Sequence, residues 1–110
     1  MILELHYGPH RIGTVEGAVW SDGTGYGVFR PSAAGDVGLE RVRRYIAFSE
    51  EWHERLRADR PHDADEFRAF ADVHESPLWH AVHPDGTSER VSGPVFVAGE
   101  VTWGVGERTS

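Results

Sequence analysis

The 110-residue sequence contains no cysteine, no lysine and only one methionine. Without cysteine, disulfides, thiolate nucleophiles and cysteine-ligated zinc are excluded. Without lysine, the phosphate-binding pattern GxxxxGK[ST] cannot occur. The chain also begins without a basic leader, and no segment approaches the roughly 20 consecutive apolar residues of a membrane span. We therefore expect a soluble cytoplasmic protein with no membrane partner.

Positive charge is scarce as well, because 11 basic residues, all arginine, stand against 18 acidic ones, giving a formal charge of −7. A nucleic-acid partner is not expected, since phosphate contacts need a basic surface. The acidic surface favours a basic protein partner through electrostatic steering. The same charge is also what keeps many small domains in solution.

Sequence patterns of catalysis and metal binding are missing too. There is no GxSxG, no HExxH, no EF-hand loop, and no strand, GxGxxG and helix in that order. His80 and His83 are three apart on a predicted strand, so their side chains point to opposite faces. We predict no catalytic residue, no metal site and no cofactor, and a non-enzymatic role is favoured. A site assembled in the fold from His53, His74 and a glutamate stays open.

What the sequence does have is one long amphipathic segment, residues 38–59. Val42, Ile46 and Leu56 recur on one side at helical spacing, which predicts a helix with a broad apolar face. A second helix is predicted from Asp63, which begins a capping box, to about Glu75. Three arginines gather in the first turns of the long helix: Arg41, Arg43 and Arg44. They could bind an anion, or they could form a solvated face paired with carboxylates.

Strands are predicted on both sides of the helices. Alternating polar and apolar residues or short apolar runs mark residues 2–7, 12–20, 24–30, 78–83, 87–91 and 95–105. Asp22-Gly23 and Asp85-Gly86 predict two-residue hairpin turns, and Gly99-Glu100 is the expected tip of a third. The first turn would pair Val19 with Tyr26, Gly17 with Val28, and Trp20 with Gly25, where the indole could cover the glycine.

These elements predict a single α+β domain over residues 1–110. We expect an antiparallel sheet of about six or seven strands, in the order three strands, two helices and four strands. The two helices would pack on one face of the sheet.

Surface recognition is the function that this pattern favours. If Leu78 and Val82 face the helices, the outer face of the sheet carries an aromatic and charged contact surface. Its members are Trp20, Trp79, His83 and Arg90, with Ser88 beside them. We expect an acidic immunity-type or adaptor module that binds a basic protein, with a homodimer also possible through this face or an edge strand.

An alternative function belongs to a different class. The chain could be a small-molecule-binding protein or a small enzyme with a pocket between the helix pair and the sheet. That pocket would be lined by Tyr45, Trp52, His53 or His74.

Overall fold

The computed structural model describes residues 2–32, 40–61 and 63–105. Three strands precede the helices: β1 (Ile2–Tyr7), β2 (His10–Ser21) and β3 (Thr24–Pro31). The helices are α1 (Glu40–Arg57), α2 (Ala64–Arg68) and α3 (Ala71–His74). Three strands follow: β4 (Trp79–Val82), β5 (Ser88–Val97) and β6 (Glu100–Val105). The sequence also favours Asp36 as the N-cap of the long helix, and this residue lies outside the described residues.

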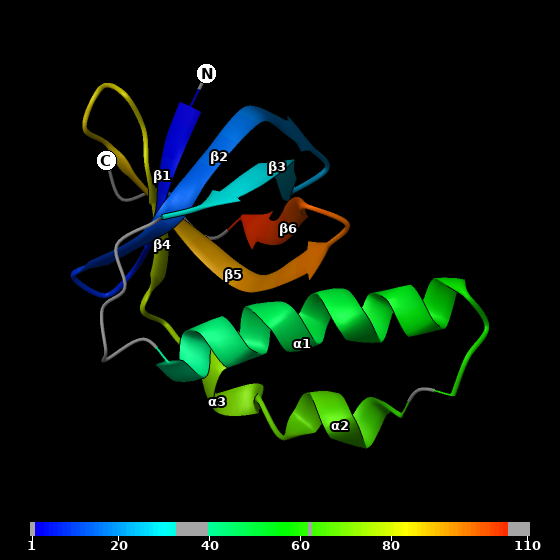
Figure 1. The fold of residues 1–110 in the computed structure, drawn as a ribbon. Coiled ribbons are helices and arrows are strands. Elements are labelled where there is room, and N and C mark those ends of the chain that lie inside the picture. Colours follow the sequence, from blue (N-terminus) through cyan, green and yellow to red (C-terminus); the bar gives the residue numbers. More distant parts are fainter. Residues whose placement is uncertain (1, 33–39, 62, 106–110) are drawn as a thin grey trace.

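The six strands form a closed antiparallel barrel in the order β1-β2-β3-β6-β5-β4 (Figure 1). The α+β class and the antiparallel pairing are confirmed, but the prediction of an open sheet with helices on one face is wrong. Closure depends on the β1–β4 and β3–β6 pairs, which join segments far apart in the sequence. A period of two shows which side of a strand is buried, and it does not show which strand edges meet.

The hairpin between β2 and β3 has the predicted turn at Asp22-Gly23, where both residues have positive φ. The predicted pairs Val19–Tyr26 and Trp20–Gly25 are confirmed. Beyond them the register shifts, because Gly17 adopts φ +62° at a β-bulge, and Glu16 rather than Gly17 pairs with Val28.

The hairpin between β5 and β6 turns one residue earlier than predicted, at Ala98-Gly99. Their φ angles are +50° and +80°, as a type I′ turn requires at its two central positions. Phe96 therefore pairs with Val101 instead of Trp103.

Bulky side chains from all parts of the barrel fill its interior, including Leu3, Leu5, Val15, Phe96 and Trp103. Gly25 makes room for one of them, because a Cβ there would lie 2.4 Å from the Trp103 ring. Glycine at this strand position thus has a packing role, and Trp103 rather than Trp20 covers it.

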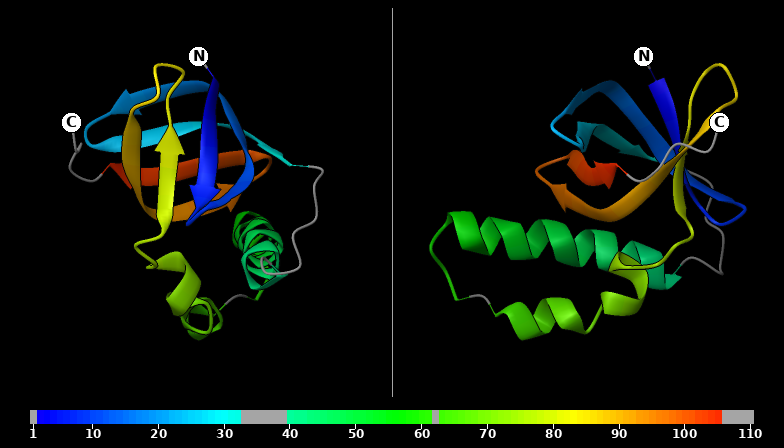
Figure 2. Two further views of the ribbon diagram at one scale, coloured as in Figure 1. Left: turned by 90° about the vertical axis from the view of Figure 1, so that its left-hand side faces the viewer. Right: turned by 180° about the vertical axis from the view of Figure 1, so that it is seen from behind.

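Helix α1 lies along one side of the barrel, and α2 lies farther out than α1 (Figures 1 and 2). The junction with β5 is polar as well as apolar. The Tyr45 hydroxyl donates to the Pro94 carbonyl at 2.6 Å, and the Ser49 hydroxyl both accepts from the Phe96 amide and donates to its carbonyl. These side chains satisfy β5 backbone groups where the strand no longer pairs with β4.

The predicted second helix is interrupted and becomes α2 and α3. Asp63 is its N-cap as predicted, since its carboxylate accepts from the Asp65 amide at 2.9 Å. Phe67 and Phe70 then pack against Phe48 of α1. Within the described part of the chain, we find no helix with the length and apolar character needed to cross a membrane.

Candidate functional site

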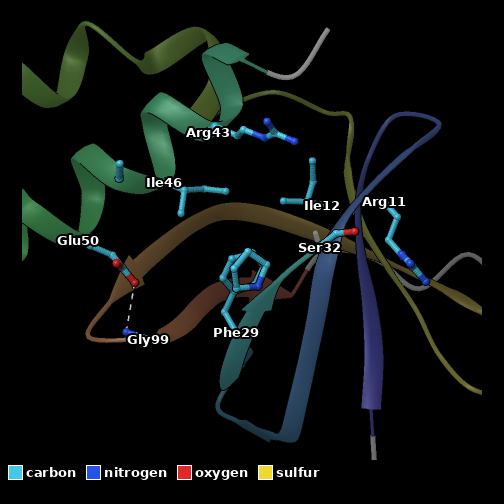
Figure 3. Close-up of a pocket in the computed structure, with 10 residues that line it drawn as sticks. Arg11, Ile12, Phe29, Ser32, Arg43, Ile46, Glu50 and Gly99 are labelled. Carbon is cyan, nitrogen blue, oxygen red and sulfur yellow. Dashed lines mark hydrogen bonds between the residues drawn. The ribbon is translucent and has the colours of Figure 1, made fainter. Parts of the chain in front are cut away.

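A cavity of about 390 Å³ lies between α1 and the barrel (Figure 3). Ten residues from both layers line it: Arg11, Ile12, Phe29, Pro31, Ser32, Arg43, Ile46, Ala47, Glu50 and Gly99. Its size falls within the range of pockets that hold small organic molecules. Apolar side chains form most of its wall, with a few polar groups, which is the usual composition of such pockets.

One face of α1 supplies one wall of the cavity. The lining residues Arg43, Ile46, Ala47 and Glu50 have the spacing i, i+3, i+4 and i+7, so they fall on one side of the helix. This face covers about two helical turns, roughly 10.5 Å at 1.5 Å per residue. It differs from the face that carries Tyr45 and Ser49 to β5.

The barrel supplies the other wall. Ile12 from β2 and Phe29 from β3 give it an apolar surface, and both side chains also belong to the core. The turn between β5 and β6 closes one end, where the Gly99 amide donates to Glu50 Oε1 at 3.1 Å (Figure 3). The barrel therefore fixes the positions of the residues that form this wall of the cavity.

The arginine cluster at the start of α1 divides between the two predicted roles. Arg41 donates to Asp72 at 2.7 Å, and its guanidinium holds the pKa of that carboxyl below its usual range. Arg44 pairs with Glu40 at 2.8 Å. Arg43 lines the cavity. Arg41 and Arg44 thus form surface pairs, and Arg43 borders the cavity.

The structure does not bring the predicted contact residues together on an outer face. Trp79 is fully buried, and its indole donates to the Val73 carbonyl at 2.7 Å. Its placement on the surface is therefore wrong: Trp79 and Ala81 point into the barrel, and His80 and Val82 alternate with them on the other side. Arg90 of β5 is exposed, and it pairs with His80 of β4 in the strand register.

Trp20 and His83 do meet, as half-buried side chains around the buried carboxylate of Glu89. Their rings stack at 5.7 Å, and both hydrogen bond to Glu89, which is 1 % exposed. The Trp103 indole donates a third hydrogen bond at 2.9 Å.

These bonds explain the ionisation of Glu89. Burial alone would raise its pKa, but the hydrogen bonds from Trp20, Trp103 and His83 outweigh that effect and lower it. A carboxylate so enclosed and so well bonded acts as a structural acceptor. Sequence analysis did not identify Glu89 as a buried acceptor. Its position two residues before Val91 places both side chains on the same face of a strand, and this was the available signal.

The side chains named for an alternative pocket do not line the cavity. Tyr45 and His74 pack against Phe67. Trp52 donates to the Asp63 carbonyl at 3.0 Å, and His53 Nδ1 lies 2.7 Å from the Ser49 carbonyl oxygen. The alternative hypothesis placed a pocket between the helix pair and the sheet, whereas the cavity lies between α1 and the barrel and is lined by another face of α1 and by β2 and β3.

Metal chemistry has little support in the part of the chain that the structure describes. No three histidine, aspartate or glutamate side chains there are placed to hold an ion together. The polar side chains of the cavity are Arg11, Ser32, Arg43 and Glu50. They can bind and orient a ligand through charge and hydrogen bonds.

Comparisons with protein-family models, curated proteins and solved structures found no match.

Proposed function

We propose that this chain is a binding protein for a small organic molecule, held between α1 and the barrel. The observation that carries the proposal is the cavity of about 390 Å³ with its apolar walls. Ile12, Phe29 and Ile46 contribute apolar surface that a ligand would remove from water, at about 25 cal/mol per Å².

The lining favours binding over catalysis. Glu50 already accepts a hydrogen bond from the Gly99 amide, and Ser32 has no base among the lining side chains other than that carboxylate. Arginine is always protonated and does not serve as a general base. The groups present orient a ligand, and none of them forms a recognisable nucleophile and base pair.

A neutral fluorescent dye, Nile red, tests whether the cavity binds organic molecules at all. The wild-type chain should give a saturable fluorescence increase at one dye per chain. Ala47→Trp places an indole in the cavity and should weaken binding at least tenfold. Leu56→Trp is the matched control, because Leu56 is exposed on the same helix and does not line the cavity. Equal binding by the two variants, or no saturable binding by the wild type, would contradict the proposal.

A second candidate function is an acidic interaction module for a basic protein, of the immunity or adaptor type. It is favoured by an apolar strip on the outside of the barrel, formed by Ile2, Val19, Tyr26 and Val28, whose exposed fractions are 42 to 55 %. Val19 pairs with Tyr26, and Glu16 sits between Ile2 and Val28 in the register. Glu100 is the partner of Val28 on its other side.

Charge decides which occupant this apolar strip favours. Glu16 is already paired with Arg30 at 2.8 Å, so Glu100 is the carboxylate of this strip that a basic partner would complement. The overall charge of −7 acts in the same direction. We therefore favour a basic protein over a homodimer.

A photo-crosslinking side chain at Tyr26, compared with one at exposed Arg57, tests this second function. A basic protein captured only from position 26 should, after purification, rebind with an affinity that falls as salt rises. Val28→Asp should weaken that binding at least tenfold. A sizing measurement that shows a dimer, lost on Val28→Asp, would instead assign the strip to self-association.

A further inference from the structure

The cavity under α1 has different polar groups at its two ends. Figure 3 shows Glu50 and Gly99 at one end and Ser32 and Arg43 toward the other, whereas the guanidinium of Arg11 points away from Arg43. Arg43 and Glu50 are seven residues apart on one face of α1, so roughly 10.5 Å of helix separates their backbones. The cavity therefore has a positive end and a negative end.

Apolar side chains fill the region between these ends. Ile46 comes from α1, Ile12 from β2 and Phe29 from β3 (Figure 3). A ligand that spans the cavity must place apolar atoms here, because a polar group at this point would lose its water without gaining a partner. Its polar groups must therefore lie at its two tips.

The charged groups suit opposite ligand chemistries. The Arg43 guanidinium carries several N–H donors that suit a carboxylate or another anion. Glu50 uses Oε1 for the Gly99 amide, and a carboxylate has further lone pairs to accept from a ligand donor. An ammonium group is the donor that gains most from this acceptor.

We infer that the cavity takes an extended molecule with an anionic tip at Arg43, an apolar middle, and an ammonium tip at Glu50. This inference rests on the proposed small-molecule function. The simplest ligand of this class is an ω-amino carboxylate, of which 8-aminooctanoate has a suitable extended length. Octanoate, octylamine and 1-octanol each lack one or both charged tips.

Titrations of the ¹⁵N-labelled full chain with these four probes, followed by NMR shifts of residues 43–50, test the inference. 8-Aminooctanoate should bind tightest. Each missing charged tip should weaken binding roughly two- to fivefold, as expected for partly exposed charge pairs.

The residues next to Arg43 and Glu50 in the sequence allow matched control variants. Arg43→Gln should weaken octanoate binding roughly two- to fivefold and leave 1-octanol unchanged. Arg44→Gln removes the same charge from a residue that pairs with Glu40 outside the cavity, and it should change neither. Glu50→Gln should weaken octylamine binding, whereas Glu51→Gln should not.

The two proposals fail in different ways. If 1-octanol shifts residues 43–50 and the charged probes bind no more tightly, the charge selection is overturned and the cavity remains a binding site. Equal effects of Arg43→Gln and Arg44→Gln would overturn it too. If none of the four probes shifts these residues, both the inference and the proposed function are contradicted.

Discussion

At the scale of single residues, Glu89 shows how a charged side chain can belong to a core. Its carboxylate accepts from Trp20 at 3.0 Å and from Trp103 at 2.9 Å, and His83 lies at 3.2 Å. Nearly all of its lone-pair capacity is thus used by side chains that are themselves partly or fully buried. Removing the carboxylate would leave buried donors without an acceptor, which costs more than the bond itself contributes.

Glu89 should make the stability of the fold depend on pH. Its pKa is lowered in the folded chain, so it stabilises the fold above the unfolded pKa, about 4.3, and this contribution is lost as the pH falls further. Glu89→Gln should reduce the free energy of unfolding at pH 7 by about 1–3 kcal/mol and flatten its decline between pH 5 and 3. Urea unfolding at several pH values measures both effects.

Asp85 is the matched control for this acid dependence. The hydroxyl and amide of Thr87 lower its pKa, but the side chain is exposed. Solvent screens such a group, so Asp85→Asn should change the slope little. Identical slopes for wild type and Glu89→Gln would contradict the role assigned to the buried carboxylate.

Two turn residues with positive φ give a second prediction at this scale. Ala98 has φ +50°, a conformation that costs an L-residue about 1–2 kcal/mol and that asparagine tolerates better. Ala98→Asn should therefore raise the free energy of unfolding by about 0.5–1 kcal/mol. Asp22→Ala, at φ +49°, should lower it by a similar amount. Thermal unfolding of the two variants checks the pair, and a loss of stability in Ala98→Asn would contradict the turn geometry.

At the scale of elements, α1 and β5 are joined by hydrogen bonds as well as by apolar packing. The Ser49 hydroxyl accepts from the Phe96 amide at 3.0 Å and donates to its carbonyl oxygen at 3.1 Å. Ser49→Ala should therefore lower the free energy of unfolding by about 1–3 kcal/mol. It should also speed amide exchange at Phe96 more than at Val101, which pairs with Phe96 on the neighbouring strand β6. Glu51→Ala, on the exposed side of α1, should leave both quantities almost unchanged.

Local sequence patterns predicted the helices and strands better than they predicted strand pairing and register. Asp22-Gly23 fixed the pairs Val19–Tyr26 and Trp20–Gly25, because a two-residue turn sets the register next to it. Two residues farther on, the bulge at Gly17 shifted the register, and nothing in the spacing of apolar residues indicated it. Trp79 was misplaced for a similar reason: alternation identifies two faces, and large residues on both sides of β4 left the buried one undecided.

The candidate site was only partly predictable. A pocket between the helix pair and the sheet was the alternative hypothesis, and Arg43 belonged to a cluster that could bind an anion or form a solvated face. Ile12 and Phe29 could not be connected with it, since β2 and β3 reach α1 only through barrel closure. The lining joins residues up to 88 positions apart, Arg11 and Gly99, and such proximity is not visible in local patterns.

At the scale of the whole molecule, the barrel and the helical layer should differ in stability. All six strands pair on both sides around the barrel, whereas α2 has five residues and buries none of them completely. Native-state hydrogen exchange should therefore show global protection in β1, β2 and β3 and markedly lower protection in α2. Protection of α2 equal to that of the strands would show that the helices and the barrel unfold as one unit.

Intermolecular NOEs between 1-octanol and the isotope-labelled chain test the small-molecule function of the cavity most directly. If the cavity binds small molecules, contacts should appear to Ile12, Phe29 and Ile46, which come from β2, β3 and α1 and line it together. Contacts confined to Val19, Tyr26 and Val28 on the outside of the barrel, or none at saturating probe, would contradict it.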